Sequence, residues 1–114
     1  MATIYKICTA AEWRAAIRDG VFRGSAVDLR DGYIHFSTAT QVRETAAKYF
    51  AGAVDLVLAA FDDAALGPGL KYEPARGGAL FPHLYGPLDP NAALSARPLP
   101  LGADGAHAFP DPGP

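Results

Sequence analysis

Residues 31–61, DGYIHFSTATQVRETAAKYFAGAVDLVLAAF, contain signals for a strand, a helix and a second strand in unbroken succession. The β-branched and aromatic run at 33–37 predicts the first strand. The segment 38–41, Thr-Ala-Thr-Gln, is a capping-box candidate for a helix that Gly52 stops. The run at 54–61 is nearly all apolar, which is typical of a central strand covered on both faces.

The residues before this stretch predict one more strand and one more helix. The run Ile-Tyr-Lys-Ile-Cys at 4–8 predicts a strand, with its cysteine buried. Thr9 and Glu12 have capping-box spacing, and Gly20 is placed to end the helix that they begin. Residues 21–29 are interpreted as an irregular loop.

The residues after it predict shorter elements. Residues 62–66 suggest a helical turn, and 70–73 and 80–85 suggest strands. Residues 93–101 contain prolines, which restrict a strand there to a sheet edge. Because strands outnumber helices and the helices cluster early, we expect an α+β fold with a curved, mainly antiparallel sheet and two main helices. We expect a single domain over residues 1–101 and a mobile C-terminal tail over residues 102–114.

Composition restricts the class of protein more than the function. The chain has 114 residues, a net charge of −2 and one cysteine. This charge does not favour general nucleic-acid binding, and one cysteine cannot form an intrachain disulfide. No signal peptide or membrane span is visible, so we expect a cytoplasmic protein with no membrane association. The sequence does not indicate an oligomeric state.

Histidines and nearby polar residues are the candidates for a functional site. Strand alternation places His35 on the face of Tyr33 and Ser37, where it could line a cleft, bind a ribose hydroxyl or transfer a proton. The alternative is a half-buried histidine that a backbone carbonyl satisfies. Tyr49, late in the second helix, fits either the core or a stacking contact with a planar ligand. No histidine, cysteine or acidic spacing supports a metal site.

A second group of candidates lies nearer the C-terminus. Glu73 and Arg76 fit a structural ion pair or a catalytic acid with an arginine beside it. Pro82 lacks a backbone donor and predicts an edge strand or a bulge. His83 and Tyr85 share one face of that strand, as ligand contacts or as a surface cluster. Three other charged residues are interpreted as ordinary turn charges: Asp28, Arg30 and Asp31.

Ten blocks of the chain together form a recognisable pattern: Tyr5–Ile7, Trp13, Gly24–Ser25, Asp31–Thr38, Thr45–Ala46, Tyr49–Phe50, Asp55–Leu58, Tyr72–Glu73, Arg76–Gly78 and Phe81–Gly86. These blocks resemble a bacterial family catalogued as domain of unknown function 952. The resemblance spans residues 4–101, and the family has no established activity.

The order of elements around residues 33–37 is more distantly similar to the C-terminal domain of RNA 2′-phosphotransferases. Those proteins belong to the ADP-ribosyltransferase-like superfamily, whose split, curved sheet holds NAD. The resemblance implies that His35 corresponds to the superfamily's strand histidine. It further implies that Glu73 is the catalytic carboxylate and that Tyr49 stacks on nicotinamide.

The leading hypothesis is therefore a nucleotide-pocket protein that transfers a group from NAD or a related phosphate-ribose ligand. NAD would be a substrate, and no cofactor is required. In this hypothesis His35 binds ribose, Glu73 stabilises an oxocarbenium-like centre or orients the acceptor, and Lys6 or Arg76 holds phosphate. The alternatives are a non-catalytic module that binds a small metabolite or a protein, and a hydrolase or isomerase that uses the two histidines. We expect one concavity to be lined by His35, Ser37, Glu73, Arg76 and His83.

Overall fold

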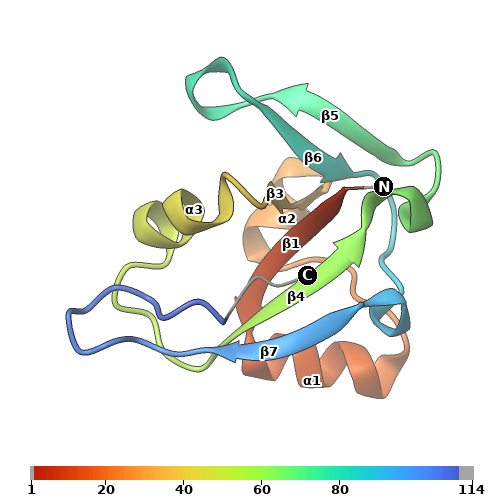
Figure 1. Cartoon of the computed structure of the whole chain (residues 1–114). Coiled ribbons are helices and arrows are strands. Elements are labelled where there is room, and N and C mark those ends of the chain that lie inside the picture. The colour runs from red at the N-terminus through yellow and green to blue at the C-terminus, as the bar shows by residue number, and fades with distance from the viewer. Residues whose placement is uncertain (1, 111–114) are drawn as a thin grey trace.

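Two antiparallel sheets, built from seven strands, organise the part of the chain that the computed structural model describes, residues 2–110 without the side chain of Arg76. The first sheet has the strand order β3-β1-β4-β7 and the second the order β2-β6-β5. Figure 1 shows the β5–β6 hairpin projecting from the rest of the molecule. The elements are β1 (Thr3–Thr9), α1 (Ala10–Asp19), α2 (Ala26–Asp31), β2 (Ile34–His35), β3 (Ser37–Thr38), α3 (Val42–Tyr49), β4 (Leu56–Asp62), η1 (Asp63–Leu66), β5 (Leu70–Pro74), η2 (Arg76–Gly78), β6 (Leu80–Leu84), η3 (Pro90–Ala92) and β7 (Ser95–Leu99).

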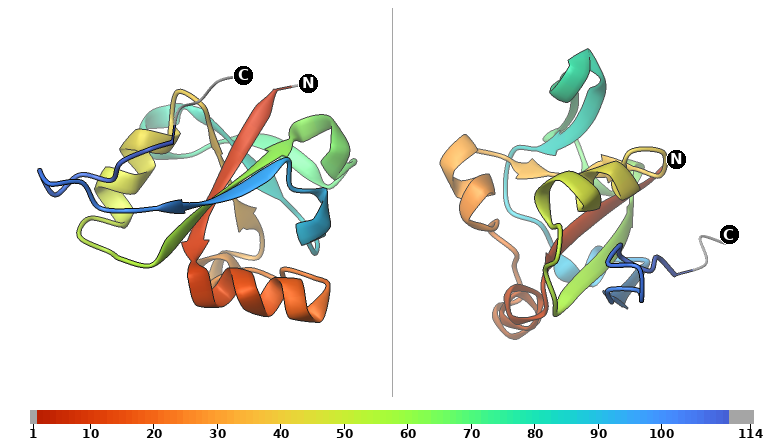
Figure 2. Two further views of the ribbon diagram at one scale, coloured as in Figure 1. Left: turned by 60° about the horizontal axis from the view of Figure 1, so that its bottom comes forward. Right: turned by 90° about the vertical axis from the view of Figure 1, so that its left-hand side faces the viewer.

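The first sheet has a hydrophobic cluster on each side. Strand β4 lies between β1 and β7, as its apolar run predicts. Helix α1 begins at the predicted capping box of Thr9 and Glu12 and ends at Gly20, whose φ is 76°. Its Trp13 packs against the cluster that contains Phe61, while α3 contributes Val42 and Ala46 to the other cluster. The two views in Figure 2 show α1 and α3 at separate places on the sheet. Cys8 is buried, as expected.

The predicted strand at 33–37 divides between the two sheets. Ile34 and His35 pair with β6, whereas Ser37 and Thr38 pair with β1. Between them, the buried side chain of Phe36 makes an edge-to-face contact with Phe61 at 5.7 Å. The α+β class with antiparallel sheets is confirmed, and this crossing of the chain couples the two sheets.

The prediction of an irregular loop at 21–29 is wrong over its second half, where α2 begins. Ser25 precedes the helix. Its backbone N–H and its hydroxyl both donate hydrogen bonds to the Asp28 carboxylate, at 2.9 Å and 3.1 Å. Gly24 has a φ of 124°, and a Cβ atom there would lie 2.8 Å from the Cβ of Asp28. Ser-x-x-Asp spacing is the sequence signal for this helix, and only glycine fits the close approach before it. The fold therefore has three α-helices in its described residues, not two.

The prediction that Pro82 marks an edge or a bulge is also wrong, because β6 is the middle strand of its sheet. The carbonyl of Pro82 accepts a hydrogen bond from the Phe36 N–H at 3.0 Å. The nitrogen and carbonyl of one strand residue point to the same neighbour, so the proline nitrogen faces the place where β2 ends. Because β2 ends there, the missing N–H of Pro82 costs the β2–β6 pairing few of its backbone hydrogen bonds. The edge position of β7 agrees with its prolines.

The segment from Gly102 is not detached from the domain as the tail prediction implied. The Nε2 atom of His107 lies 3.0 Å from the Ala53 carbonyl oxygen, within hydrogen-bonding distance. The backbone of His107 also forms an isolated antiparallel β-bridge with Leu101. Phe109 packs on the cluster beneath α3, with the Arg43 guanidinium 4.9 Å from its ring centre. The prediction also covers residues 111–114, which lie outside the described residues. None of the helices within the described residues is both long and apolar enough to cross a membrane.

Candidate functional site

A cleft of about 630 Å³ lies where β1, α2, the β2–β3 crossing, α3 and β6 meet. Its volume is within the range of small-molecule sites. Five of the predicted site residues line it: Lys6, His35, Ser37, Tyr49 and His83. Tyr33 lines it as well, so the alternation of Tyr33, His35 and Ser37 correctly predicted the face that turns toward the cleft.

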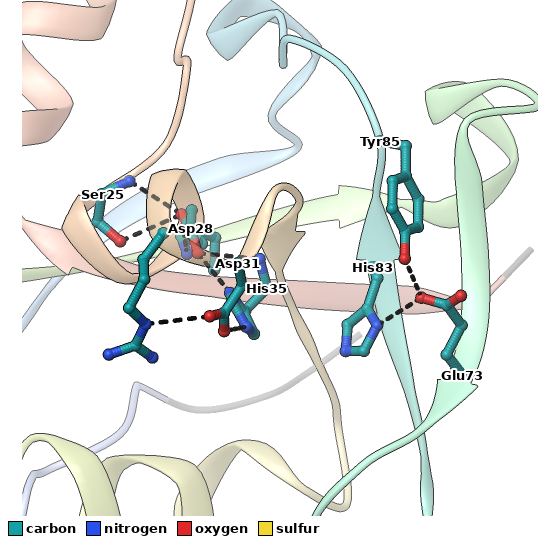
Figure 3. A network of polar contacts seen from close by, with 9 residues as sticks. Ser25, Asp28, Asp31, His35, Glu73, His83 and Tyr85 are labelled. Carbon is teal, nitrogen blue, oxygen red and sulfur yellow. Dashed lines mark hydrogen bonds and ion pairs between the residues drawn. The ribbon is translucent and has the colours of Figure 1, made fainter.

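A buried ionic network forms one wall of the cleft (Figure 3). Lys6 and Asp28 are both buried, and the Lys6 ammonium donates to Asp28 Oδ2 at 2.8 Å. Asp28 Oδ1 accepts from the backbone N–H of His35 at 3.1 Å and lies 2.6 Å from its Nδ1. Burial alone would raise the pKa of Asp28, but the hydrogen bond from His35 and the charge of Lys6 hold it well below its usual value. Asp28 is thus ionised, and the interpretation of Asp28 as an ordinary turn charge is wrong.

The ring of His35 lies between two carboxylates. Its Nε2 is 3.0 Å from Asp31 Oδ2, opposite the contact with Asp28. The Arg30 guanidinium donates a hydrogen bond that lowers the pKa of Asp31, so this carboxylate is ionised too. Ionised carboxylates only accept hydrogen bonds, so both contacts are satisfied when the imidazole carries both protons. Because both ring nitrogens face carboxylates, this geometry fixes the orientation of His35 and leaves neither nitrogen without a partner.

The second histidine has one carboxylate partner. His83 Nδ1 lies 2.8 Å from Glu73 Oε1, and the Tyr85 hydroxyl donates to the same oxygen at 2.7 Å (Figure 3). The hydrogen bond from His83, followed by that from Tyr85, lowers the pKa of Glu73. His83 itself is 3% exposed. Glu73 therefore orients an imidazole instead of entering the cleft.

Tyr33 joins the two histidines. Its ring stacks on His83 with the centroids 4.1 Å apart and lies 4.6 Å from the centroid of His35. The two imidazole centroids are 5.6 Å apart. Burial raises the pKa of the Tyr33 hydroxyl, so the phenol stays neutral at physiological pH. The Tyr33 ring thus contacts both imidazoles and helps to fix their orientations.

The predicted residues differ in how they relate to this cleft. Glu73 and Tyr85 are absent from its lining among the residues that the structure describes. Lys6 is buried against Asp28, which leaves it unsuited to the predicted contact with phosphate. The prediction for Arg76 falls on a side chain outside the described residues. Tyr49 is 64% exposed at the cleft, so the core interpretation of Tyr49 is wrong.

Sequence reasoning missed several residues of the site, among them Asp31, which was interpreted as a turn charge although its Oδ2 lies 3.0 Å from His35 Nε2. Asp28 holds the buried network, Tyr33 joins the histidines, and Thr45 pairs with Ser37 through their hydroxyl oxygens at 2.8 Å. The capping-box spacing of Ser25 and Asp28 was a readable signal. No local pattern indicated Thr45, because its contact with Ser37 depends on how α3 packs on β3.

The fold and the cleft define a small α+β pocket domain with two carboxylate-held histidines. A sequence model of the family described as "Protein of unknown function (DUF952)" matches residues 7–96, and the chain belongs to this family. The chain is similar to protein CC0527 from Caulobacter crescentus. The crystal structure of that protein has a TM-score of 0.89 and 52% identity over 93% of each chain.

The solution structure of the same protein agrees. It has a TM-score of 0.84 and 53% identity, over 93% of this chain and 91% of that one. None of the curated proteins matches the sequence significantly. The family resemblance inferred from the sequence is therefore confirmed, and the family and its solved structures supply no activity.

Proposed function

We propose that the cleft binds a nucleotide-like small molecule, with a planar ring at its aromatic rim and a hydroxyl-bearing part at its histidine wall. One observation carries this proposal: aromatic rings and convergent polar groups line the same cleft. Tyr49 is the main rim residue, because it is 64% exposed yet adjoins the cleft. The other aromatic side chains are Tyr5, Tyr33, Phe36, Phe50 and Phe81, and the serine and threonine hydroxyls include those of Ser37 and Thr45.

The finer proposal is an ADP-ribosyltransferase-like fold that acts on NAD. The cleft lining draws residues from both antiparallel sheets, which supports it, as does the position of His35 in the cleft wall. In this proposal the edge of the His35 ring positions the ribose. Glu73 acts through His83 and does not touch the ligand, which differs from the role implied by the resemblance. Phosphate would have to be held by residues other than Lys6.

A second candidate function is acid–base catalysis by the histidine pair, in a hydrolase or an isomerase. The observation that favours it is the 5.6 Å separation of the two imidazole centroids, with a carboxylate on Nδ1 of His83. Such a carboxylate fixes the tautomer and stabilises the protonated ring during proton transfer. Both nitrogens of His35 already face carboxylates, so His83 would be the proton-transferring member of the pair. This candidate needs the same cleft and ligand, so binding is the first test for both.

A thermal-shift titration with NAD, ADP-ribose, AMP and adenosine tests the binding proposal. A probe at 100 times its dissociation constant should stabilise the fold by about 2.7 kcal/mol. Tyr49→Ala should weaken binding by about 0.5–1.5 kcal/mol through loss of ring stacking. Leu94→Ala is a matched control, because Leu94 is 63% exposed and lies outside the cleft lining.

The proposal fails if none of these probes stabilises the protein, or if Tyr49→Ala and Leu94→Ala behave alike toward a probe that does. Release of nicotinamide from NAD separates the transferase from the non-catalytic module. Binding of NAD without any release would favour the module.

A further inference from the structure

The ring of His83 has one nitrogen with a partner and one without. Its side chain is 4% exposed, and Nδ1 faces Glu73 at 2.8 Å. The face of the ring is covered by Tyr33 at 4.1 Å. Among the described residues, Nε2 has no hydrogen-bond partner. Buried polar atoms nearly always have partners, so a buried nitrogen without one points to a ligand.

The unpartnered nitrogen is on the cleft side of the ring. His83 belongs to the cleft lining, whereas Glu73, which binds Nδ1, does not. The two nitrogens are on different edges of an imidazole, so the edge turned to the cleft is the one with Nε2. Figure 3 shows the second nitrogen of His83 on the side away from Glu73.

The partner of Nδ1 decides what Nε2 can do. The Glu73 pKa is lowered by His83 and Tyr85, so Glu73 is an ionised, accept-only group at neutral pH. It therefore requires a proton on Nδ1, and a neutral imidazole then keeps its lone pair on Nε2. In contrast, both nitrogens of His35 face carboxylates. His83 is thus the ring of this pair that can accept a hydrogen bond from a ligand.

The charges around the cleft favour a neutral group at this point. Lys6 is paired with Asp28, and Arg30 with Asp31. His35 lies between the same two carboxylates. Among the described residues of the cleft lining, the two cations Lys6 and Arg30 thus have anionic partners and add little attraction for a phosphate. A hydroxyl donor needs no such attraction.

We propose that His83 is the ligand-binding acceptor of the cleft and that Nε2 recognises a neutral hydroxyl donor, such as a sugar hydroxyl. Glu73 and Tyr85 are positioning residues that fix the tautomer. The inference rests on the proposed function for the identity of the ligand, because a nucleoside offers a planar ring and such hydroxyls. Its own test uses the hydroxyl contact alone.

Long-range proton–nitrogen NMR of the ¹⁵N-labelled full chain reads the protonation of each ring nitrogen. His83→Phe assigns the His83 signals, and the wild type alone suffices if that variant does not fold. In the neutral ring we expect the proton on Nδ1, which faces Glu73, and the lone pair on Nε2. Addition of D-ribose or adenosine should shift the Nε2 resonance.

Affinity measurements complete the test. The wild type should bind adenosine roughly ten-fold more tightly than 2′,3′-dideoxyadenosine, as expected for one lost hydrogen bond. His83→Phe keeps a ring against Tyr33 and should bind the two compounds equally. His107→Phe is the matched control and should keep the ten-fold preference, because His107 contacts the Ala53 carbonyl outside the cleft lining.

The outcomes separate the two proposals. An Nε2 signal that neither ribose nor adenosine shifts overturns the inference, whether or not adenosine binds. Equal affinity of the wild type for adenosine and its dideoxy form also overturns it, while leaving the binding of a planar ring in the cleft intact. A shift with ribose, when adenosine, AMP and NAD all fail to bind, supports the role of His83 and overturns the proposed function.

Discussion

Replacement of Asp28 by asparagine tests the buried network most directly. Asp28 accepts hydrogen bonds from Lys6, Ser25 and the backbone of His35, and its contact with His35 Nδ1 is 2.6 Å long. Asparagine has nearly the same shape but no charge, and its amide would place a donor against other donors. The change also leaves Lys6, whose side chain is 4% exposed, as an uncompensated buried cation.

Removal of one partner from a buried ion pair typically costs about 3–5 kcal/mol. Because the whole free energy of unfolding of a domain is about 5–15 kcal/mol, Asp28→Asn should lose a large fraction of it. Urea denaturation at pH 7 should show a lower midpoint at unchanged slope. The double variant Lys6→Met/Asp28→Asn should be more stable than Asp28→Asn alone, because it removes the stranded charge.

Acid provides a second measurement on the same variant. The folded pKa of Asp28 lies below its unfolded value, so its stabilisation is complete above the unfolded pKa and is lost as the pH falls toward the folded pKa. The difference between wild type and Asp28→Asn should therefore stay constant near neutral pH and shrink once the pH falls below the unfolded pKa of 3.8.

The control is Asp19→Asn, whose partner Arg18 has a side chain that is 74% exposed, and its midpoint should not move. The reasoning is refuted if Asp28→Asn costs less than about 1 kcal/mol, or if Lys6→Met adds to the loss instead of offsetting it.

Three further predictions concern other parts of the chain. Phe109→Ala should lower stability by about 1–2 kcal/mol, because the ring packs beneath α3, and each kcal/mol corresponds to about 4–8 °C in a domain of this size. An unchanged melting temperature would mean that the docked segment adds nothing to stability. Tyr85→Phe should raise the Glu73 pKa toward its usual 4.5, since the tyrosine donates to the ionised carboxylate. Carbon NMR titration of the side-chain carboxyl measures this, and an unmoved titration contradicts the role of Tyr85. Burial raises the pKa of Cys8 to about 12, so the thiol should resist a disulfide reagent at pH 8 in the native protein and react in urea. Rapid labelling of the native protein would contradict that burial.

Local signals were sufficient for most of the elements. The apolar run of β4 and the capping box at Thr9 and Glu12 correctly predicted a central strand and a helix. The prolines of β7 correctly placed it at a sheet edge. These features depend on contacts within a few residues or on side-chain alternation, which the sequence itself contains. The helix α2 was missed although Ser25 and Asp28 have the spacing that begins one.

The pairing of strands and of charges was decided by tertiary structure. Strand alternation already places Phe36 on the core side, but nothing local in residues 33–37 indicates that the strand divides between two sheets there. Pro82 could be accommodated in a central strand only because β2 ends opposite its nitrogen. Both outcomes depend on which distant strand pairs with which.

The site divides in the same way. The sequence by itself determined that His35 and Ser37 turn to the same side, because side chains alternate along a strand. It also placed His83 among the polar candidates. Only the tertiary structure decided that Glu73 orients His83 from outside the cleft lining and that Lys6 is committed to Asp28. Lys6 and Asp28 are 22 positions apart in the chain, and their ion pair exists because the tertiary fold brings the two side chains together in a buried place.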